Sequence, residues 1–201
     1  MEIRGTGSYL PGKIITNDDL SEVVDTNDEW ISSRTGICQR HISEGETTSE
    51  MAAKAAVVAL EDAEVSPEEV ELIIVATMTG DEAMPGTACK VQKEIGAVHA
   101  ACFDLSAACT GFVFALNTAN AYLASGMYRN ALVIGADMVS KVIDWTDRAT
   151  CVFFGDGAGA VFVRADNTKR YVAVTGSDGL KGDVLWAGRI PLKNLLVKND
   201  F

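Results

Sequence analysis

Hydrophobic and polar positions along the chain fall into patterns of two kinds. In the segment 48–64, apolar residues recur at Met51, Ala55, Val58 and Ala59, which is the spacing of one helical face, and a Thr-Ser pair at its start suits a helix cap. Comparable patterns predict further helices over 17–24, 28–33, 87–95 and 110–125.

The second pattern is the short, continuous apolar run. ELIIVATMT at 71–79 is rich in β-branched residues and predicts a buried strand. Further strands are predicted over 3–10, 100–105, 130–136, 151–154, 159–163 and 170–176. Near-continuous apolar strands between helices indicate an α/β fold, with a sheet that helices cover on both faces.

Composition and charge narrow the class of protein. At 201 residues and 48% hydrophobic, the chain can bury one sizeable core, and we expect one globular unit. Its apolar runs are far shorter than the roughly 20 residues of a membrane span, and no signal peptide is evident, so we expect a cytoplasmic protein. A net charge of −11 argues against binding to nucleic acids or anionic membranes.

The five cysteines are an odd number without a CxxC pair, which predicts free thiols and no zinc site. Cys109 stands out because it lies in FDLSAACTGFVFAL (103–116), where a predicted strand meets a predicted helix. A helix start favours the reactive thiolate, and its free N–H groups can hold a developing oxyanion. Local pattern alone leaves core packing open for Cys109. For the other four we expect packing roles: Cys38, Cys89, Cys102 and Cys151.

Four motifs carry a family resemblance. GTGSYLPGKIITNDDL (5–20), DTNDEWISSRTGICQRHI (25–42), DLSAACTGFVFAL (104–116) and DWTDRATCVFFGDGAGAVFV (144–163) together resemble β-ketoacyl-acyl carrier protein synthase III. The resemblance implies a thiolase-like fold, a layered α-β-α arrangement with a mostly buried mixed sheet, built as two pseudo-symmetric halves. Residues 1–179 would be the N-terminal half, and 180–201 the start of the linker or of the second half.

The resemblance also implies an activity. Enzymes of this family move a short acyl group from acyl-CoA onto a cysteine, here Cys109, and condense it with malonyl-acyl carrier protein with loss of carbon dioxide, which starts fatty acid synthesis. They are homodimers and use no metal or other cofactor. Their catalytic histidine and asparagine belong to the second half, so we expect this chain alone not to complete the condensation.

Other positions match family residues that bind CoA. Trp30 of DEWI matches the residue that stacks on the adenine, and Arg148 of DWTDRAT matches the one on the other side of the base. Arg34 of SSRTG matches an arginine that meets CoA phosphates, and Thr26 a nearby hydrogen-bonding threonine. Met84 falls where the family places a residue that lines the acyl pocket of the dimer partner.

The remaining motif residues are expected to be structural. Asp156, Gly157 and Gly159 match a family motif that suits a tight strand connection, and His41 and His99 are expected in loops or on the surface. One position departs from the family, which commonly has glycine where this chain has Ala149. Two alternatives stay open: a related thiolase-fold synthase with another acceptor, and a non-catalytic dimerisation module.

Overall fold

A five-stranded mixed sheet forms the centre of the computed structural model, which describes residues 1–187. Its strands are β1 (Glu2–Tyr9), β4 (Leu72–Ala76), β5 (Ala101–Leu105), β6 (Asn130–Met138) and β7 (Asp156–Arg164). They lie in the order β1–β7–β6–β4–β5. β4 is parallel to β5 and β6, whereas β7 is antiparallel to β6 and β1. The carboxyl ends of the three parallel strands therefore meet at one edge of the sheet.

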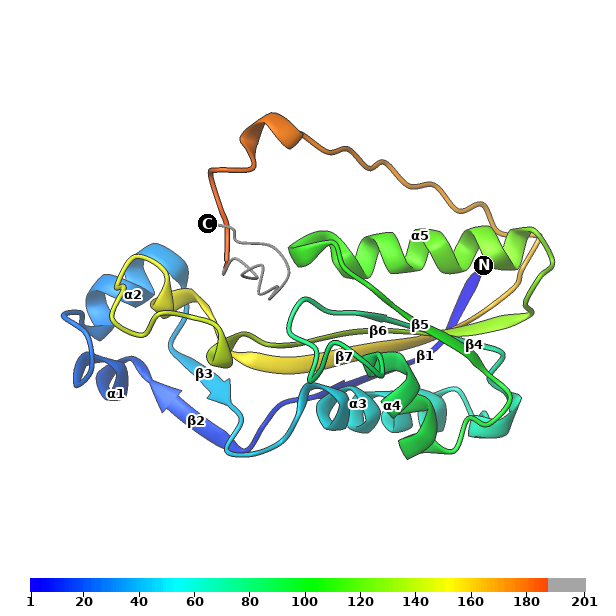
Figure 1. Cartoon of the computed structure of the whole chain (residues 1–201), viewed down its shortest axis with the longest axis horizontal. Coiled ribbons are helices and arrows are strands. Elements are labelled where there is room, and N and C mark those ends of the chain that lie inside the picture. Colours follow the sequence, from blue (N-terminus) through cyan, green and yellow to red (C-terminus); the bar gives the residue numbers. More distant parts are fainter. Residues whose placement is uncertain (188–201) are drawn as a thin grey trace, which may run out of the picture.

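Helices cover both faces of this sheet. The helices are α1 (Asn17–Ser21), α2 (Asp28–Thr35), α3 (Thr48–Asp62), α4 (Thr87–Ile95) and α5 (Gly111–Ala124). α3 and α4 pack on one face and α5 on the other (Figure 1). Every residue of β4 is buried, as its continuous apolar pattern predicts. The predicted layered α-β-α arrangement with a mixed sheet is confirmed.

Two glycines let α3 approach β1 closely. A Cβ atom on Gly5 would lie 2.3 Å from the carbonyl oxygen of Ala59, and one on Gly7 would lie 2.3 Å from that of Ala55. No side chain fits at such distances, because the contacts are with helix backbone. The glycines of the GTGSY motif therefore serve the packing of this layer.

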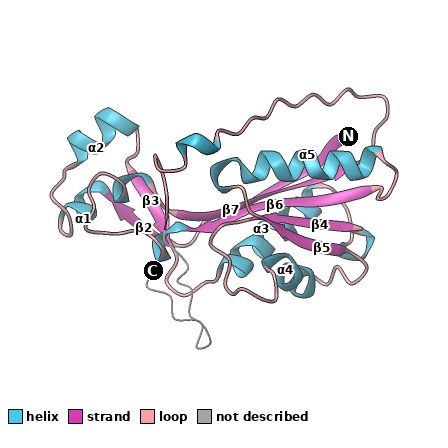
Figure 2. Ribbon diagram, turned by 45° about the horizontal axis from the view of Figure 1, so that its top comes forward, coloured by secondary structure: helices cyan, strands magenta, loops and turns pink. Residues whose placement is uncertain are grey.

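A smaller lobe lies beside the sheet (Figure 2). It contains α1, α2 and a two-stranded antiparallel sheet of β2 (Lys13–Thr16) and β3 (Gln39–Ile42). Leu20, Ile31, Cys151 and Val152 form its buried core. This small sheet was not predicted, since its strands have only four residues each, and β2 is mostly exposed, so they carry little apolar pattern.

The structure corrects several sequence-based boundaries. Residues 151–154 are not a strand: Cys151–Phe153 forms a 3₁₀ turn whose first two residues fill the core of the smaller lobe. Residues 170–176 are not a strand either, and run without regular structure past α5, where the Tyr171 hydroxyl donates to Asn117 Oδ1 at 2.5 Å. Asp156, Gly157 and Gly159 lie within β7, not in a connection before it.

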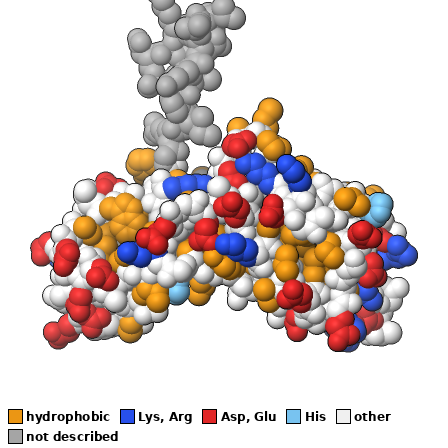
Figure 3. All heavy atoms as spheres, turned by 90° about the horizontal axis from the view of Figure 1, so that it is seen from below, with side chains coloured by type: hydrophobic (Ala, Val, Ile, Leu, Met, Phe, Trp, Pro, Cys, Tyr) orange, Lys and Arg blue, Asp and Glu red, His pale blue; other side chains and the backbone are white. Residues whose placement is uncertain are grey.

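Four more 3₁₀ turns complete the described part: η1 (Pro67–Glu69), η2 (Ala108–Thr110), η3 (Val139–Lys141) and η5 (Gly179–Lys181). The expected division at residue 179/180 stays a prediction, and positions 188–201 lie outside the described residues. Among residues 1–187, no helix is long and apolar enough to cross a membrane. Figure 3 shows the two lobes with a concave surface between them, and acidic side chains on both.

Candidate active site

Cys109 is exposed at the first turn of α5. It lies in the 3₁₀ turn Ala108–Thr110, between the carboxyl end of β5 and Gly111, the first residue of α5. In parallel α/β sheets, ligands bind at the carboxyl ends of the strands. Figure 1 shows this end of α5 facing the smaller lobe. The thiol is therefore open to a ligand that lies between the lobe and the sheet.

The backbone around Cys109 is constrained. Ala108 has φ +45°, in the left-handed region that costs an L-residue roughly 1–2 kcal/mol. Such strain often accompanies functional sites. At Gly111, a Cβ atom would come within 3.2 Å of the Ala76 methyl, so glycine lets the helix start close against β4. Unlike α1, α2 and α3, α5 has no side-chain cap; its first residue, Gly111, donates its N–H to Ala108 O in the preceding 3₁₀ turn.

A second cluster in the smaller lobe brings together residues from distant parts of the sequence. The guanidinium carbon of Arg148 lies 5.0 Å from the centroid of the Trp30 ring, and that of Arg34 lies 4.7 Å from it. Arg148 also donates to the backbone oxygen of Asp25 at 3.0 Å. A half-buried indole with two cations is suited to an anionic ligand that contains an aromatic base.

Thr26 lies in the same lobe as these residues. Its Oγ1 atom is buried, and among the described residues it has no hydrogen-bond partner. A buried hydroxyl without a partner costs free energy, which a ligand can recover by supplying the missing hydrogen bond. Thr26, Trp30 and Arg34 from one motif and Arg148 from another thus lie in the same lobe, where both arginines contact the Trp30 ring.

Two aspartates shape the loop that presents Arg148. Asp144 Oδ1 accepts from the backbone N and the hydroxyl of Thr146, at 2.9 and 2.7 Å. Asp147 accepts from Ala149 N at 2.9 Å and from the Thr150 hydroxyl at 2.7 Å. The spacing of Asp and Thr in DWTDRAT is a turn signal that could have identified both carboxylates.

Arg40 fastens the 3₁₀ turn Cys151–Phe153, which follows this loop, to the rest of the lobe. It is 5% exposed, and it donates to Ile15 O at 3.1 Å, to Asn17 Oδ1 at 2.7 Å and to Val152 O at 3.4 Å. Burial lowers the pKa of this guanidinium. The sequence does not single out Arg40, because a charged residue in a strand of only four residues gives no sign of burial.

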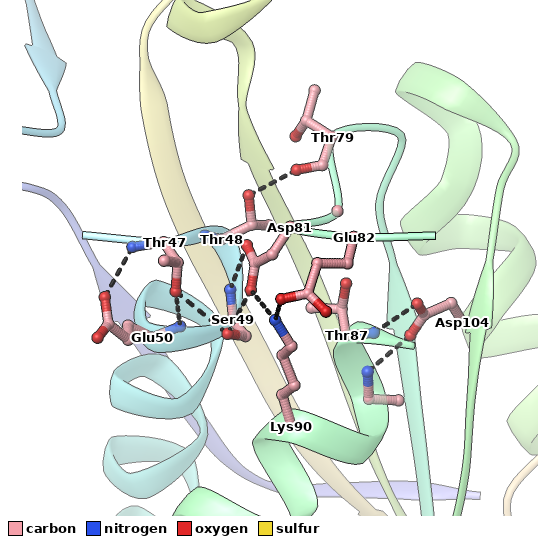
Figure 4. Close-up of polar contacts among 12 residues, drawn as sticks. Thr47, Thr48, Ser49, Glu50, Thr79, Asp81, Glu82, Thr87, Lys90 and Asp104 are labelled. Carbon is pink, nitrogen blue, oxygen red and sulfur yellow. Dashed lines mark hydrogen bonds and ion pairs between the residues drawn. The ribbon is translucent and has the colours of Figure 1, made fainter. Parts of the chain in front are cut away.

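A third feature is the loop 77–86, which carries Met84. Met84 itself is 80% exposed. Asp81 ties the loop to the start of α3, accepting from Thr48 N at 2.8 Å and from the Ser49 hydroxyl at 2.6 Å (Figure 4). Burial acts to raise the pKa of Asp81, but hydrogen bonds from Ser49 and Thr48 and the charge of Lys90 outweigh it, so that the pKa is lowered.

The same loop is fixed to β6. Asp137 Oδ1 accepts from Met78 N at 2.9 Å and from the Thr79 hydroxyl at 2.7 Å. Lys141 donates to the carbonyl oxygens of Thr79 and Gly80. The loop thus presents an exposed methionine from an anchored backbone.

The remaining candidates have structural environments. Asp156 is buried and accepts from Ser43 N at 2.8 Å and from Ser140 N at 2.9 Å, which supports its structural assignment. His41 lies in β3 and is partly buried, with its Nδ1 atom 2.6 Å from Pro11 O, which corrects the prediction of a loop or surface position. His99 lies exposed in the turn before β5, as predicted. Cys151 is buried, in agreement with its predicted packing role. Cys38 and Cys89 are exposed, so the packing role predicted for both is wrong.

The chain is similar to known proteins over most of its length. A family model for 3-oxoacyl-[acyl-carrier-protein] synthase III matches residues 103–179, which include Cys109 and Arg148. A β-ketoacyl-[acyl-carrier-protein] synthase III of Clostridium acetobutylicum is 58% identical over 186 residues, 92% of this chain. The chain is a relative of β-ketoacyl-[acyl-carrier-protein] synthase III. It spans 57% of the length of the Clostridium protein.

Solved structures of related enzymes share the fold. The crystal structure of 3-oxoacyl-[acyl-carrier-protein] synthase III from Aquifex aeolicus has a TM-score of 0.81 and 52% identity, covering 83% of this chain and 54% of that one. The priming β-ketosynthase of the R1128 polyketide pathway has a TM-score of 0.80 and 41% identity, covering 83% and 50%. The chain therefore has the thiolase-like fold that its motifs imply.

Proposed function

We propose that this chain provides the acyl-accepting site of a β-ketoacyl-[acyl-carrier-protein] synthase III. The Cys109 thiolate attacks the thioester carbonyl of a short acyl-CoA, the CoA thiolate leaves, and a Cys109 thioester remains. In the whole protein the acyl group is then condensed with malonyl-acyl carrier protein, with loss of carbon dioxide. The observation that carries this proposal is the exposed Cys109 at the uncapped start of α5.

CoA is proposed to lie in the smaller lobe. Its adenine would stack on Trp30 with Arg148 on the opposite side of the base, its phosphates would meet Arg34, and Thr26 Oγ1 would gain a partner. A base that stacks between an aromatic ring and a guanidinium group needs a separation of about 7 Å between the two. This is twice the optimal distance between two carbon atoms in contact. Arg148 lies at 5.0 Å, so the loop 144–150 has to move outward by about 2 Å when the base enters.

The proposal extends to assembly. As a condensing enzyme of fatty acid synthesis, the whole protein would be a cytoplasmic homodimer without a metal or other cofactor. Met84 would then reach the acyl pocket of the partner subunit, a role to which its exposure on an anchored loop is suited. A different acceptor is the alternative, which the similarity to a priming polyketide β-ketosynthase favours. Assays with the two acceptors and the whole protein distinguish these activities.

Acyl transfer is tested by incubation with radiolabelled acetyl-CoA, followed by peptide mapping. We expect one label, on the peptide with Cys109, that Cys109→Ala abolishes. Cys38→Ser is the matched control, because Cys38 is also exposed, and it should keep the label. A folded protein that takes up no label, or a label that persists in Cys109→Ala, contradicts the proposal.

A further inference from the structure

Lys141 binds the backbone of the loop 77–86. It is the last residue of the turn η3, which follows β6 directly. Its Nζ atom donates to Gly80 O at 3.0 Å, to Thr48 Oγ1 at 3.3 Å and to Thr79 O. An ammonium group has three N–H donors, so these contacts use all of them. In the described part of the chain Lys141 forms no ion pair, so its ammonium serves the loop and not a carboxylate.

Asp137 and Lys141 hold opposite polar groups of the same short segment. Asp137 Oδ1 accepts from the backbone N atoms of Met78 and Thr79, at 2.9 and 3.2 Å. Lys141 donates to the carbonyl oxygens of Thr79 and Gly80. The carboxylate therefore binds the donors and the ammonium binds the acceptors. Removal of the ammonium leaves carbonyl oxygens without this donor, so one side of the segment is no longer held.

Met84 lies on a short span between two further fixed points. Asp81 is hydrogen-bonded to the start of α3, and Thr87 N donates to Asp104 Oδ2 at 2.6 Å (Figure 4). Met84 is three positions from Asp81 and three from Thr87. The segment that Lys141 holds ends directly before Asp81. Because the span is short, a displacement of that segment moves Met84 as well.

We propose that Lys141 is a positioning residue for acyl-chain selection in the partner subunit. By holding the carbonyl oxygens of Thr79 and Gly80, it sets how far Met84 reaches into the acyl pocket of that subunit. Lys141 itself touches no substrate and acts only through the loop. The inference rests on the proposed function, in which Met84 lines the partner's pocket, and adds the group that fixes the position of Met84.

Loss of the ammonium should weaken the discrimination between acyl chains. Lys141→Met keeps most of the length of the side chain but donates no hydrogen bond. The loop then moves more freely, and the partner's pocket excludes a longer acyl chain less well. We expect the preference for the best acyl-CoA over the one two carbons longer to fall by about tenfold, which is the low end of what a pocket gains by rejecting one methylene group.

The test uses hybrid dimers of the whole protein, purified through a different affinity tag on each subunit. One subunit keeps Cys109 and the other carries Cys109→Ala, so that acyl transfer reports only on the first subunit. The rate constant of acyl transfer is measured with straight-chain acyl-CoA thioesters from acetyl to hexanoyl. Lys141→Met in the Cys109→Ala subunit should weaken the discrimination, whereas Lys141→Met in the Cys109 subunit should leave it as in the wild type.

Lys169→Met is the matched control. Lys169 pairs with Glu2 at the first residue of β1, whereas the loop 77–86 follows the carboxyl end of β4. Lys169→Met should change the discrimination in neither hybrid. If Lys141→Met does not fold, Lys141→Gln takes its place, since glutamine is uncharged but keeps two N–H donors. It should give a smaller change in the same direction, and no change in a folded hybrid overturns the inference.

Met84→Ala in the Cys109→Ala subunit separates this inference from the proposed function. If Met84→Ala changes the discrimination and Lys141→Met in the same subunit does not, the inference is overturned while the proposed function stands. If Met84→Ala also has no effect, the loop does not line the partner's pocket, and the proposed role of Met84 fails together with the inference. An equal effect of Lys141→Met in both hybrids also overturns the inference, because it indicates a general structural role.

Discussion

Arg148 places its guanidinium carbon 5.0 Å from the centre of the Trp30 ring, although the two residues come from opposite ends of the smaller lobe's sequence. Trp30 is on α2, and Arg148 is on a loop that Asp144 and Asp147 shape through side-chain hydrogen bonds. The loop also contacts the segment before α2, where Arg148 donates to Asp25 O at 3.0 Å. The contact joins the two motifs that are proposed to hold a nucleotide.

The first prediction concerns Arg148→Met. Loss of a desolvated cation over an aromatic group costs about 1–2 kcal/mol, which is roughly a five- to thirtyfold rise in the Kd for CoA. Calorimetric titration of each protein with CoA measures this Kd. Arg4→Met is the control, because Arg4 is exposed on β1 and pairs with Glu2 away from this lobe. Equal affinity in Arg148→Met and the wild type contradicts the CoA placement.

A second prediction concerns Arg40, whose guanidinium joins β3 to Asn17 and to Val152. Arg40→Met leaves buried acceptors without donors, and we expect a loss of about 2 kcal/mol in the free energy of unfolding. Arg40→Lys should lose less of this free energy of unfolding, since the lysine ammonium group can donate to some of the same buried acceptors. Urea unfolding followed by circular dichroism measures both. If Arg40→Met is as stable as the wild type, the free energy lost by desolvating the Arg40 charge equals the free energy gained from its hydrogen bonds.

The sequence predicts the central layers well because their pattern is continuous. The strand predicted in ELIIVATMT and the helix predicted over 87–95 match β4 and α4, since both bury a long apolar face. The strand predicted over 151–154 is wrong because an apolar run of four residues fits a turn as readily as a strand, and here only Cys151 and Val152 are buried. The β2–β3 sheet was missed because its two strands are short and far apart in sequence, and β2 is mostly exposed.

For the site, motif resemblance identified the groups proposed to touch a ligand but not those that hold them. Trp30 and Arg148 were predicted, and the structure brings them into contact. Arg40, Asp81 and Asp137 were missed, although each fixes a loop through several hydrogen bonds. Their roles depend on burial and on partners distant in sequence, and neither leaves a local pattern. The contacts of Lys141 were missed for the same reason.

A third prediction tests the strain at Ala108, whose φ is +45°. Ala108→Gly removes a cost of about 1–2 kcal/mol in the folded state but adds up to about 1 kcal/mol of unfolded-chain entropy. We expect the variant to be equally stable or more stable by up to about 2 kcal/mol. Ala121→Gly, at an exposed position inside α5, is the matched control and should lose about 1 kcal/mol. Equal losses in both variants would show that the Ala108 backbone is not strained.

The last prediction concerns the pH dependence of stability at Asp81. Its side chain is 8% exposed, and its pKa is lowered from the ordinary value of 3.8. A carboxyl group with a lowered pKa in the folded state stabilises the fold fully above its unfolded pKa. That stabilisation disappears as the pH falls through the lowered value. The contribution is therefore complete at pH 7 and declines only below about pH 4.

Asp81→Asn removes this titration. At pH 7 we expect it to lower the free energy of unfolding by about 2 kcal/mol, because Thr48 N, the Ser49 hydroxyl and Lys90 lose a charged acceptor. Urea unfolding measured from pH 7 down to about 3 should show the wild type losing stability more steeply than the variant, so that the two curves converge in acid. Asp183→Asn, at an exposed position, should follow the wild type throughout. A constant gap between the wild type and Asp81→Asn at every pH would show that the carboxylate charge contributes nothing and that only the shape of the side chain holds the loop.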